Sequence, residues 1–405
     1  MVEYKTQSNV LSKNVVITSF LLALFIDVKT INLVIIAAQP SLAGIFMSAM
    51  YAIVAVGLFA IGLLVQKRDI LNLRPNHIGI CLLCIVWYAF TDTFIATPSV
   101  NVSYFGIFMV AAFLIPGLIR MDIRIFLLSL IIFPSIGVLY LDKIFFSEIL
   151  ETGIVSMGTC YAFLVPVLGN LVYLRFFYRK EPLWIKIVML FFAAINIYYL
   201  VQMTMFGSRG PILCVLLLIL SFFIIQIDDK GKIAMRKGRT SIILICLVLI
   251  TLSFTAILQT LKDFFATFDI SLNVVDKFLR LSESGDMTNG REVISSKSWE
   301  GISNSPLWGN GTSQFLNNTG MVYPHNFILQ LLYDGGIILT SFVIVPIARM
   351  LIFKIKTVSE SEFICLLFMF FASVPCSLFS GDLWNAGTLW MFFGFVLAKN
   401  SIVKT

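Results

Sequence analysis

Two arginines stand at positions that favour binding of an anion. Arg291 follows the turn-forming residues 288–290 and would occupy the first turn of a helix from about 291 to 302, where its charge opposes the helix dipole. Arg209, in "MFGSRGPIL", stands at the start of an apolar run, and Pro211 suits the first position of a helix there. Arginine side chains and free helix N-terminal amides both bind phosphate-like anions. We therefore predict anion contacts for both arginines; the alternatives are a solvated loop arginine at 291 and an interfacial one at 209.

One of only two histidines lies directly before another apolar run, in "MVYPHNFILQLLYDGG", residues 321–336. A histidine has an unperturbed pKa of about 6.5, so it can take up a proton near neutral pH. Pro324 can set the turn before the helix and place His325 at the membrane edge. His325 is therefore a candidate for proton transfer. The alternative is a pair, His325 and Asn326, that only caps the helix.

Membrane-spanning helices are expected to position these residues. Of the 405 residues, 59% are hydrophobic and 13% charged, with a mean hydropathy of +0.95, against about 45–50% apolar and about 25% charged in soluble domains. The composition predicts an all-α polytopic membrane protein, with residues 1–405 forming a single integral membrane domain. Runs of the roughly 17–25 residues that cross a bilayer recur along the chain. Twelve spans are expected, at approximately 15–37, 43–66, 77–95, 100–119, 124–141, 153–177, 183–203, 210–227, 240–259, 325–350, 361–380 and 383–399.

The charges between these spans indicate the orientation. Alternate connections are rich in Lys and Arg, which accumulate on the cytoplasmic side of a membrane, whereas "ATPSV" and "SGD" in the intervening set are short and poor in basic residues. Both termini are therefore expected in the cytoplasm, without a cleavable signal peptide. The net charge of +7 follows from this topology, so it gives no support for nucleic-acid binding.

One large hydrophilic loop, residues 260–323 between the ninth and tenth spans, is expected on the outer side and is expected to carry part of the active site. Apolar residues at helical spacing over 262–281 predict an amphipathic helix in the membrane interface. Trp299, Trp308 and Tyr323 are candidates for aromatic stacking on a ligand, although anchoring at the interface is the commoner use of such residues.

The sequence offers no residue pattern that favours metal binding or redox chemistry. His77 lies on the predicted inner side and His325 on the outer side, so they cannot share an ion, and the acidic residues of the outer loop are scattered. All seven cysteines fall within expected spans, where the usual role is a small buried apolar residue. We therefore expect no metal, no other cofactor and no disulfide framework.

The order and membrane positions of four short motifs resemble the O-antigen ligase and O-antigen polymerase superfamily. The motifs are "SRG" at the top of a span, "GRE" in the outer loop, then "PLWGNGTSQF" and "HNFILQLLYDGG", and the resemblance covers residues 209–340. It implies a membrane glycosyltransferase with a C-type fold in the bacterial cytoplasmic (inner) membrane, its active site facing the periplasm or exterior. Such enzymes use a glycan carried on undecaprenyl diphosphate and need no metal.

The resemblance also assigns roles by position. Arg209 and Arg291 match the family's two diphosphate-contacting arginines, and His325 matches its loop histidine. Two arginines suit a leaving diphosphate, because their planar donors match phosphate oxygens, and a histidine suits deprotonation of the acceptor hydroxyl. Asn326, Tyr323, Trp299 and Trp308 are the expected substrate contacts.

The motif before the tenth span favours a polymerase of lipid-linked repeat units for O-antigen, capsule or exopolysaccharide. His325, Asn326 and Gly336 fit the ligase pattern, but Leu339 occupies its last position and Thr340 is one residue late. The alternative is a ligase that transfers the glycan to lipid A core. A flippase or transporter is the lesser alternative, because neither midplane ionisable groups nor related halves are evident. The expected partners are the lipid-linked donor and acceptor, the bilayer, a chain-length regulator and a flippase.

Overall fold

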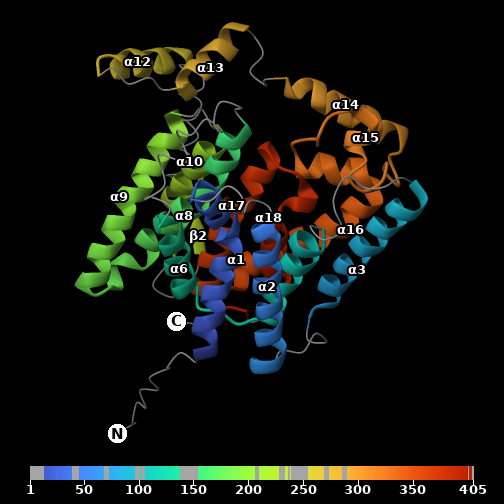
Figure 1. Cartoon of the computed structure of the whole chain (residues 1–405), viewed down its shortest axis with the longest axis horizontal. Coiled ribbons are helices and arrows are strands. Elements are labelled where there is room, and N and C mark those ends of the chain that lie inside the picture. Colours follow the sequence, from blue (N-terminus) through green and yellow to red (C-terminus); the bar gives the residue numbers. More distant parts are fainter. Residues whose placement is uncertain are drawn as a thin grey trace.

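Helices form nearly all of the chain that the computed structural model describes (Figure 1). The described residues are 13–38, 45–67, 73–95, 102, 105–136, 154–205, 209–227, 233–235, 238, 254–268, 273–284, 290–399 and 401–403. A helix satisfies its own backbone hydrogen bonds, which a bilayer cannot do, so apolar runs of this length fold as helices. The expectation of an all-α polytopic membrane protein is met, apart from one short antiparallel pair of strands, β1 (Ile225–Ile227) and β2 (Ile233–Met235).

Eleven of the twelve expected spans coincide with described helical segments, and the ninth, 240–259, lies mainly outside the described residues. Five segments are long and apolar enough to cross a membrane by themselves: Lys13–Ile35, Pro75–Ile95, Leu183–Thr204, Phe327–Thr357 and Glu360–Phe379. The helical segments at the expected spans are α1 (Lys13–Ala38), α2 (Ile45–Ala60) with η2 (Ile61–Val65), α3 (Pro75–Phe90) with η4 (Thr91–Ile95), η5 (Phe105–Ala111) with α5 (Ala112–Leu118), α6 (Ile123–Ile136), α8 (Ile154–Phe176), α9 (Leu183–Met205), α10 (Arg209–Ile224), α16 (Phe327–Thr357), α17 (Glu360–Phe379) and α18 (Gly387–Leu397).

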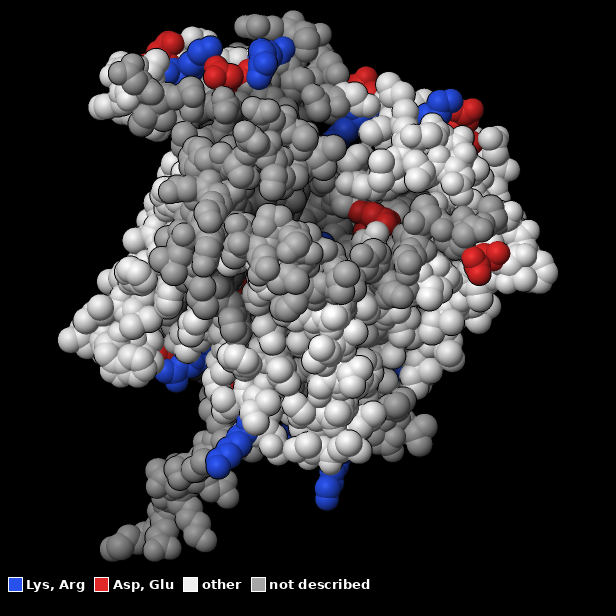
Figure 2. All heavy atoms as spheres, in the orientation of Figure 1, with Lys and Arg blue, Asp and Glu red and all other residues white. Residues whose placement is uncertain are grey.

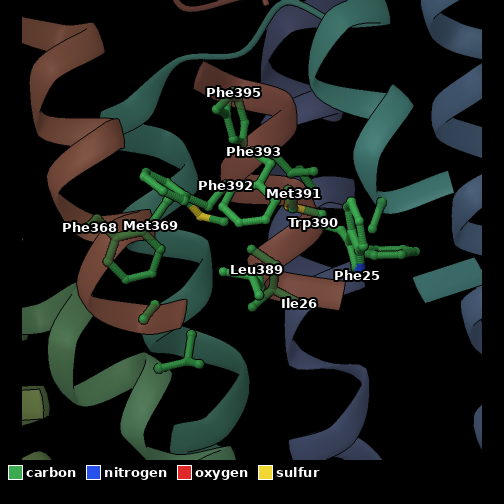
Figure 3. Close-up of a cluster of buried hydrophobic side chains, with 14 of the residues drawn as sticks. Phe25, Ile26, Phe368, Met369, Leu389, Trp390, Met391, Phe392, Phe393 and Phe395 are labelled. Carbon is green, nitrogen blue, oxygen red and sulfur yellow. The ribbon is translucent and has the colours of Figure 1, made fainter. Parts of the chain in front are cut away.

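The core is built around α18, which is buried from Leu389 to Leu397. Its aromatic residues pack with Phe368 and Met369 of α17 and lie beside Phe25 and Ile26 of α1 (Figure 3). Gly394 lets α18 approach α5 closely, because a side chain there would meet the backbone carbonyl of Phe113. Small residues at such crossings are how membrane helices pack tightly.

Several connections meet on one face of the bundle. The Gln66 amide, after η2, donates to Thr18 Oγ1 of α1 at 2.8 Å and to the Arg120 carbonyl at 3.0 Å. The next residue, Met121, pairs with the segment after α18, receiving a hydrogen bond from Val403 N at 2.9 Å. These are connections that the loop charges predict to share one side of the membrane.

The opposite face carries the helices of the large loop (Figure 1). Here lie α12 (Phe254–Ala266), α13 (Asn273–Ser284), α14 (Arg291–Asn304) and α15 (Phe315–Thr319). The expected helix from 291 to about 302 is confirmed as α14. The expectation of one amphipathic helix over 262–281 is wrong, because the chain turns at Thr267 and Phe268 and the apolar positions belong to two helices, α12 and α13, packed together through Leu258 and Val275.

Charged side chains are distributed as a membrane protein requires. Among the described residues in Figure 2, blue and red atoms gather mainly over α12 to α14, and mainly blue atoms appear again at the lower edge. The band between them is mostly uncharged. Large apolar side chains such as Leu183, Trp184 and Phe191 of α9 are exposed, which is the pattern of a surface that faces lipid.

Candidate functional site

Two of the sequence motifs, "PLWGNG" at 306–311 and "LLYDGG" at 331–336, form one interlocked unit. Gly336, with φ of 60°, breaks the helical geometry inside α16, and a side chain there would collide with the backbone of Leu307 and Trp308. Gly309, with φ of 72°, packs equally closely on the backbone of Asp334 and Gly335. The backbone groups freed at the helix break are paired with the loop, through Asn310 N to Tyr333 O at 2.7 Å, Gly311 N to Asp334 O at 2.9 Å, Ile337 N to Pro306 O at 2.9 Å and Ile338 N to Leu307 O at 3.2 Å.

Helix α14 is fixed to the same unit. Gly301 of α14 packs directly on the ring of Tyr333, which is 1% exposed and accepts a hydrogen bond from Asn318 Nδ2 at 3.0 Å. Tyr333, Ile302 and Phe315 form a small separate core under the outer loop. Arg291 is the first residue of α14, directly after Gly290, whose φ of 76° is left-handed. The position of Arg291 is therefore set by packing against α16, which begins just after His325.

His325 has an unusual backbone conformation, with φ of 59°, immediately before α16. Its ring lies against that of Tyr323, with centroids 4.3 Å apart, and its Nδ1 is buried without a hydrogen-bond partner among the described residues. Burial lowers the pKa of His325, and the nearby charge of Arg291 lowers it further. The imidazole is therefore kept neutral near pH 7, which is the form that accepts a proton.

Asn326 caps α16, since its side-chain oxygen accepts hydrogen bonds from Ile328 N at 3.0 Å and Leu329 N at 3.2 Å. A structural use thus accounts for this oxygen of Asn326, as the capping alternative anticipated. Capping by Asn326 does not account for His325, whose ring takes no part in the cap. A substrate contact through the Asn326 amide nitrogen stays a prediction.

A cavity of about 430 Å³ opens beside Tyr323, between membrane helices. Its wall comes from α1, α2, η5, α8, α17 and α18 and from the connection 380–386. The polar residues of the wall are Lys29, Thr30, Tyr51, Tyr161, Tyr323, Ser377, Ser380, Asp382, Asn385 and Thr388. A cavity of this size suits a small-molecule head group, for which pockets of about 300–1,000 Å³ are usual.

Tyr161 connects the cavity to both arginine positions. Its hydroxyl lies against Gly210, so close that a side chain at 210 would displace it, and Gly210 is the second residue of α10. The guanidinium of Arg291 interacts electrostatically with Tyr161 and with His325. The N-terminus of α10, which begins at Arg209, therefore reaches the same region as Arg291, although the side chain of Arg209 itself is outside the description.

The three aromatic residues predicted to stack on sugars, Tyr323, Trp308 and Trp299, lie in different places in the structure. Tyr323 lines the cavity. Trp308 instead stacks on Trp87 of α3, with ring centroids 6.1 Å apart and planes at 7°, and Trp299 lies on the exposed surface of α14. Neither tryptophan lines the cavity. If either one contacts a glycan, it contacts sugars that lie outside the cavity.

Other polar residues of the site were not among the sequence candidates. Lys29, Tyr161 and Asp382 line the cavity, Asp382 from the connection between α17 and α18. Gln330, one turn into α16, donates to Asp382 Oδ1 at 2.5 Å and accepts from Leu383 N at 2.8 Å, which ties this connection to the helix that follows His325. The sequence feature that could have indicated these cavity residues is the pair of charged residues, Asp27 and Lys29, inside the first apolar span.

His77 is placed as expected, away from the site. It is buried at the start of α3, where one ring nitrogen contacts the Phe113 carbonyl at 2.6 Å and the ring packs on Phe113 and Gly117. Over the described part of the chain, no three His, Cys, Asp or Glu side chains gather in a way that suits a metal ion.

The sequence model of the O-antigen ligase family matches residues 194–344. These residues contain Arg209, Arg291 and His325, and they include the interlocked unit of 306–311 with 331–336. No curated protein matches the chain. The match supports the resemblance seen in the four motifs and, in general terms, a function of the O-antigen ligase or polymerase type. The match supports placing the chain in the O-antigen ligase and polymerase superfamily, whose members are membrane enzymes of the glycosyltransferase type.

Proposed function

We propose that this protein polymerises glycan repeat units carried on undecaprenyl diphosphate at the outer leaflet of the bacterial cytoplasmic membrane. The observation that carries the proposal is that three elements converge on two residues, Tyr323 and Tyr161, that line one cavity. Tyr323 lines the cavity and packs on His325. The charge of Arg291 interacts electrostatically with His325 and with Tyr161. Tyr161 also lines the cavity and contacts Gly210 at the N-terminus of α10. A proton acceptor and two anion-binding positions are thus linked, through Tyr323 and Tyr161 of the cavity wall, to one space that is lined by membrane helices.

The reaction divides between these groups. The acceptor hydroxyl oxygen attacks the anomeric carbon of the donor sugar, and the bond from that carbon to the phosphate oxygen breaks. The hydroxyl proton passes to neutral His325, and the lipid diphosphate leaves with the electron pair. Arg291 and Arg209 stabilise the charge that develops on the leaving diphosphate, as preorganised donors do in a water-poor site. Direct displacement inverts the configuration at the anomeric carbon.

The chemistry assigned to these residues requires no divalent ion. Arginine side chains remain charged at any working pH and neutralise phosphate directly. Purified protein in lipid nanodiscs, supplied with the correct lipid-linked repeat unit, is expected to form longer products in the presence of a chelator. Loss of turnover with chelator, restored by a divalent ion, would overturn this mechanism.

Polymerase activity is favoured over ligase activity by Leu339, which occupies the last position of the ligase pattern and is fully buried in α16. A polymerase also needs a second lipid-linked substrate from the same leaflet. The exposed apolar side chains of α12, including Phe264, and of Phe268 just after it offer a surface in the interface along which such a lipid can approach.

A ligase that transfers the finished glycan to lipid A core is the second candidate, favoured by the description of the matching family. The two functions differ in the acceptor, so deletion of the gene in its host separates them. A polymerase mutant is expected to carry surface glycan of at most one repeat unit. Long chains that accumulate on undecaprenyl diphosphate, with none on lipid A core, would establish the ligase instead.

A transporter is tested with the same purified protein. Reconstituted vesicles loaded with labelled lipid-linked glycan would show translocation without any change in glycan length if the protein were a flippase. The proposed enzyme is expected to change the glycan length. It should leave the rate of translocation the same as in protein-free vesicles that carry the same labelled glycan.

A further inference from the structure

Lys29 is a cation inside the bundle that no motif of the sequence assigns. It lies 16 residues after the start of α1 at Lys13, which corresponds to about 24 Å along the helix at about 1.5 Å per residue. Its neighbours Phe25, Ile26 and Val28 are buried in the core, whereas Lys29 is exposed into the cavity that it lines. A lysine at this depth is costly unless it faces a polar space or an anion.

The groups around Lys29 leave its charge only partly balanced. Its Nζ lies 5.8 Å from the ring centroid of Phe108, another residue of the cavity wall. Within the described part of the chain, the ammonium forms no ion pair at 4.0 Å or less, and the carboxylate that acts on it electrostatically is Asp382.

Asp382 is already occupied by three hydrogen-bond donors. Its Oδ1 accepts from Gln330 Nε2 at 2.5 Å and from Trp384 N at 3.2 Å, and its Oδ2 accepts from Asn385 Nδ2 at 2.7 Å. Asp382 is therefore held in place by its own connection and by α16. It cannot move to pair with Lys29 without breaking these bonds, so the ammonium stays available to a ligand.

We propose that Lys29 binds a phosphate group of the polyprenyl diphosphate donor inside this cavity, as a third cation beside the two arginines. The inference rests on the proposed function and assigns the cavity a ligand: the diphosphate, with the first sugar towards Tyr323 and His325. Lysine binds phosphate as a point charge with three donors, which complements the planar arginine side chains. The Asp382 carboxylate opposes the same anion, so the two residues have opposite effects on donor binding.

Opposite effects separate this role from a structural one. If Lys29 and Asp382 only stabilised each other, removal of either charge would weaken the site in the same direction. If Lys29 binds the diphosphate, Lys29→Met weakens binding and Asp382→Asn strengthens it. The second change is tolerable, because the new amide side chain keeps the oxygen that faces Gln330. The Asn385 amide can turn its oxygen, now buried without a partner among the described residues, towards the new amino group.

The experiment measures equilibrium binding of radiolabelled geranylgeranyl diphosphate to the purified full-length protein in nanodiscs. Lys29→Met is expected to weaken binding about tenfold or more, as for loss of a hydrogen bond to a charged group. Lys29→Arg should stay close to wild type and Asp382→Asn should bind a few-fold more tightly. The matched control is Lys297→Met, which removes the same charge from the outer loop at an exposed side chain paired with Glu300. Geranylgeraniol and inorganic pyrophosphate, as competitors, distinguish recognition of the lipid, of free phosphate and of the two together.

Each outcome decides a separate claim. Absence of any diphosphate-dependent binding by wild-type protein would defeat the proposed function and this inference together. Wild-type binding with equal values for Lys29→Met and Lys297→Met would overturn the role of Lys29 and leave the proposed function standing. Weaker binding in both Lys29→Met and Asp382→Asn would show a structural pair and also overturn it. If Lys29→Met does not fold, Lys29→Met with Asp382→Asn is compared with Asp382→Asn alone, and equal binding by these two proteins would contradict the proposal.

Discussion

Tyr323 and His325 lie two residues apart with their ring centroids 4.3 Å from each other, and Tyr323 also lines the cavity between the membrane helices. One aromatic ring therefore connects the proposed base to the space proposed for the donor. His325 itself stands outside the cavity wall, next to the outer loop. This arrangement suits a reaction in which the donor lies among the helices and the acceptor hydroxyl approaches from the outer loop.

The contact between Tyr323 and His325 predicts that the ring at position 323 matters more than its hydroxyl. Tyr323→Phe is expected to retain most of the turnover, whereas Tyr323→Ala should lower it about tenfold or more, because both the cavity wall and the packing of His325 are lost. The measurement is the rate of product formation at saturating donor. Trp308→Ala is the control, since Trp308 belongs to the same loop but packs on Trp87. Equal losses in Tyr323→Ala and Trp308→Ala would contradict a specific role for the ring.

The pKa of His325 predicts the pH dependence. Base catalysis needs neutral imidazole, so turnover should rise with pH through a pKa below the ordinary value of about 6.5. Arg291→Met removes a positive charge that disfavours protonation, so the acid limb of its residual activity should move to higher pH. Arg291→Lys keeps the charge and should leave the limb in place. A limb that is identical in wild type and Arg291→Met would remove the electrostatic link between these residues.

The glycines of the interlocked unit predict a difference between two similar substitutions. Gly336→Ala forces a residue with a side chain into the left-handed region and drives its methyl group into the Leu307 backbone, so it should destabilise the protein by about 3 kcal/mol or more and abolish activity. Gly320→Ala, with φ of 72° and open space around it, should cost about 1 kcal/mol from backbone strain alone. Thermal unfolding in detergent measures both. Similar shifts for the two variants would show that the loop does not pack on the helix break.

Gln330 predicts how the connection between α17 and α18 supports the site. Gln330→Leu removes the hydrogen bonds to Asp382 and from Leu383 N together. Asp382 keeps its bonds from Trp384 and Asn385, whereas the buried Leu383 N loses its partner, which costs about 1–3 kcal/mol. We expect lower stability and weaker donor binding. Gln330→Glu can still accept from Leu383 N but places a second carboxylate beside Asp382, so donor binding should weaken further. Unchanged donor binding in both variants would mean that the connection does not shape the cavity.

Much of this arrangement could be predicted from the sequence where the signal is local. Hydropathy located eleven helical segments, and the turn formers before Arg291 with the breakers after residue 304 located α14. The motif around His325 also placed the helix cap correctly in the alternative that involved Asn326. These features depend on residues that are close together in the sequence, so they can be predicted from the sequence alone.

The contacts between distant segments could not be predicted in this way. Side chains facing lipid and side chains facing other helices are both apolar, so the helices around the cavity have no marked polar face to identify them. Lys29 and Asp382 come from opposite ends of the chain, and Trp308 meets Trp87 on a helix far earlier in the sequence. The division of 262–281 into α12 and α13 also escaped the pattern, because regular apolar spacing continues on both sides of the turn at Thr267.

The central claim is that this protein breaks the bond between a glycan and a lipid diphosphate and forms a glycosidic bond with the same glycan. The most direct measurement follows both events in one reaction of purified protein with a lipid-linked repeat unit labelled in the sugar and in the phosphate. The account predicts one lipid diphosphate released for each new glycosidic bond, in the presence of chelator, with both signals lost together in His325→Ala while donor binding is retained. Glycan that stays attached to its lipid diphosphate throughout, or equal rates in wild type and His325→Ala, would contradict it.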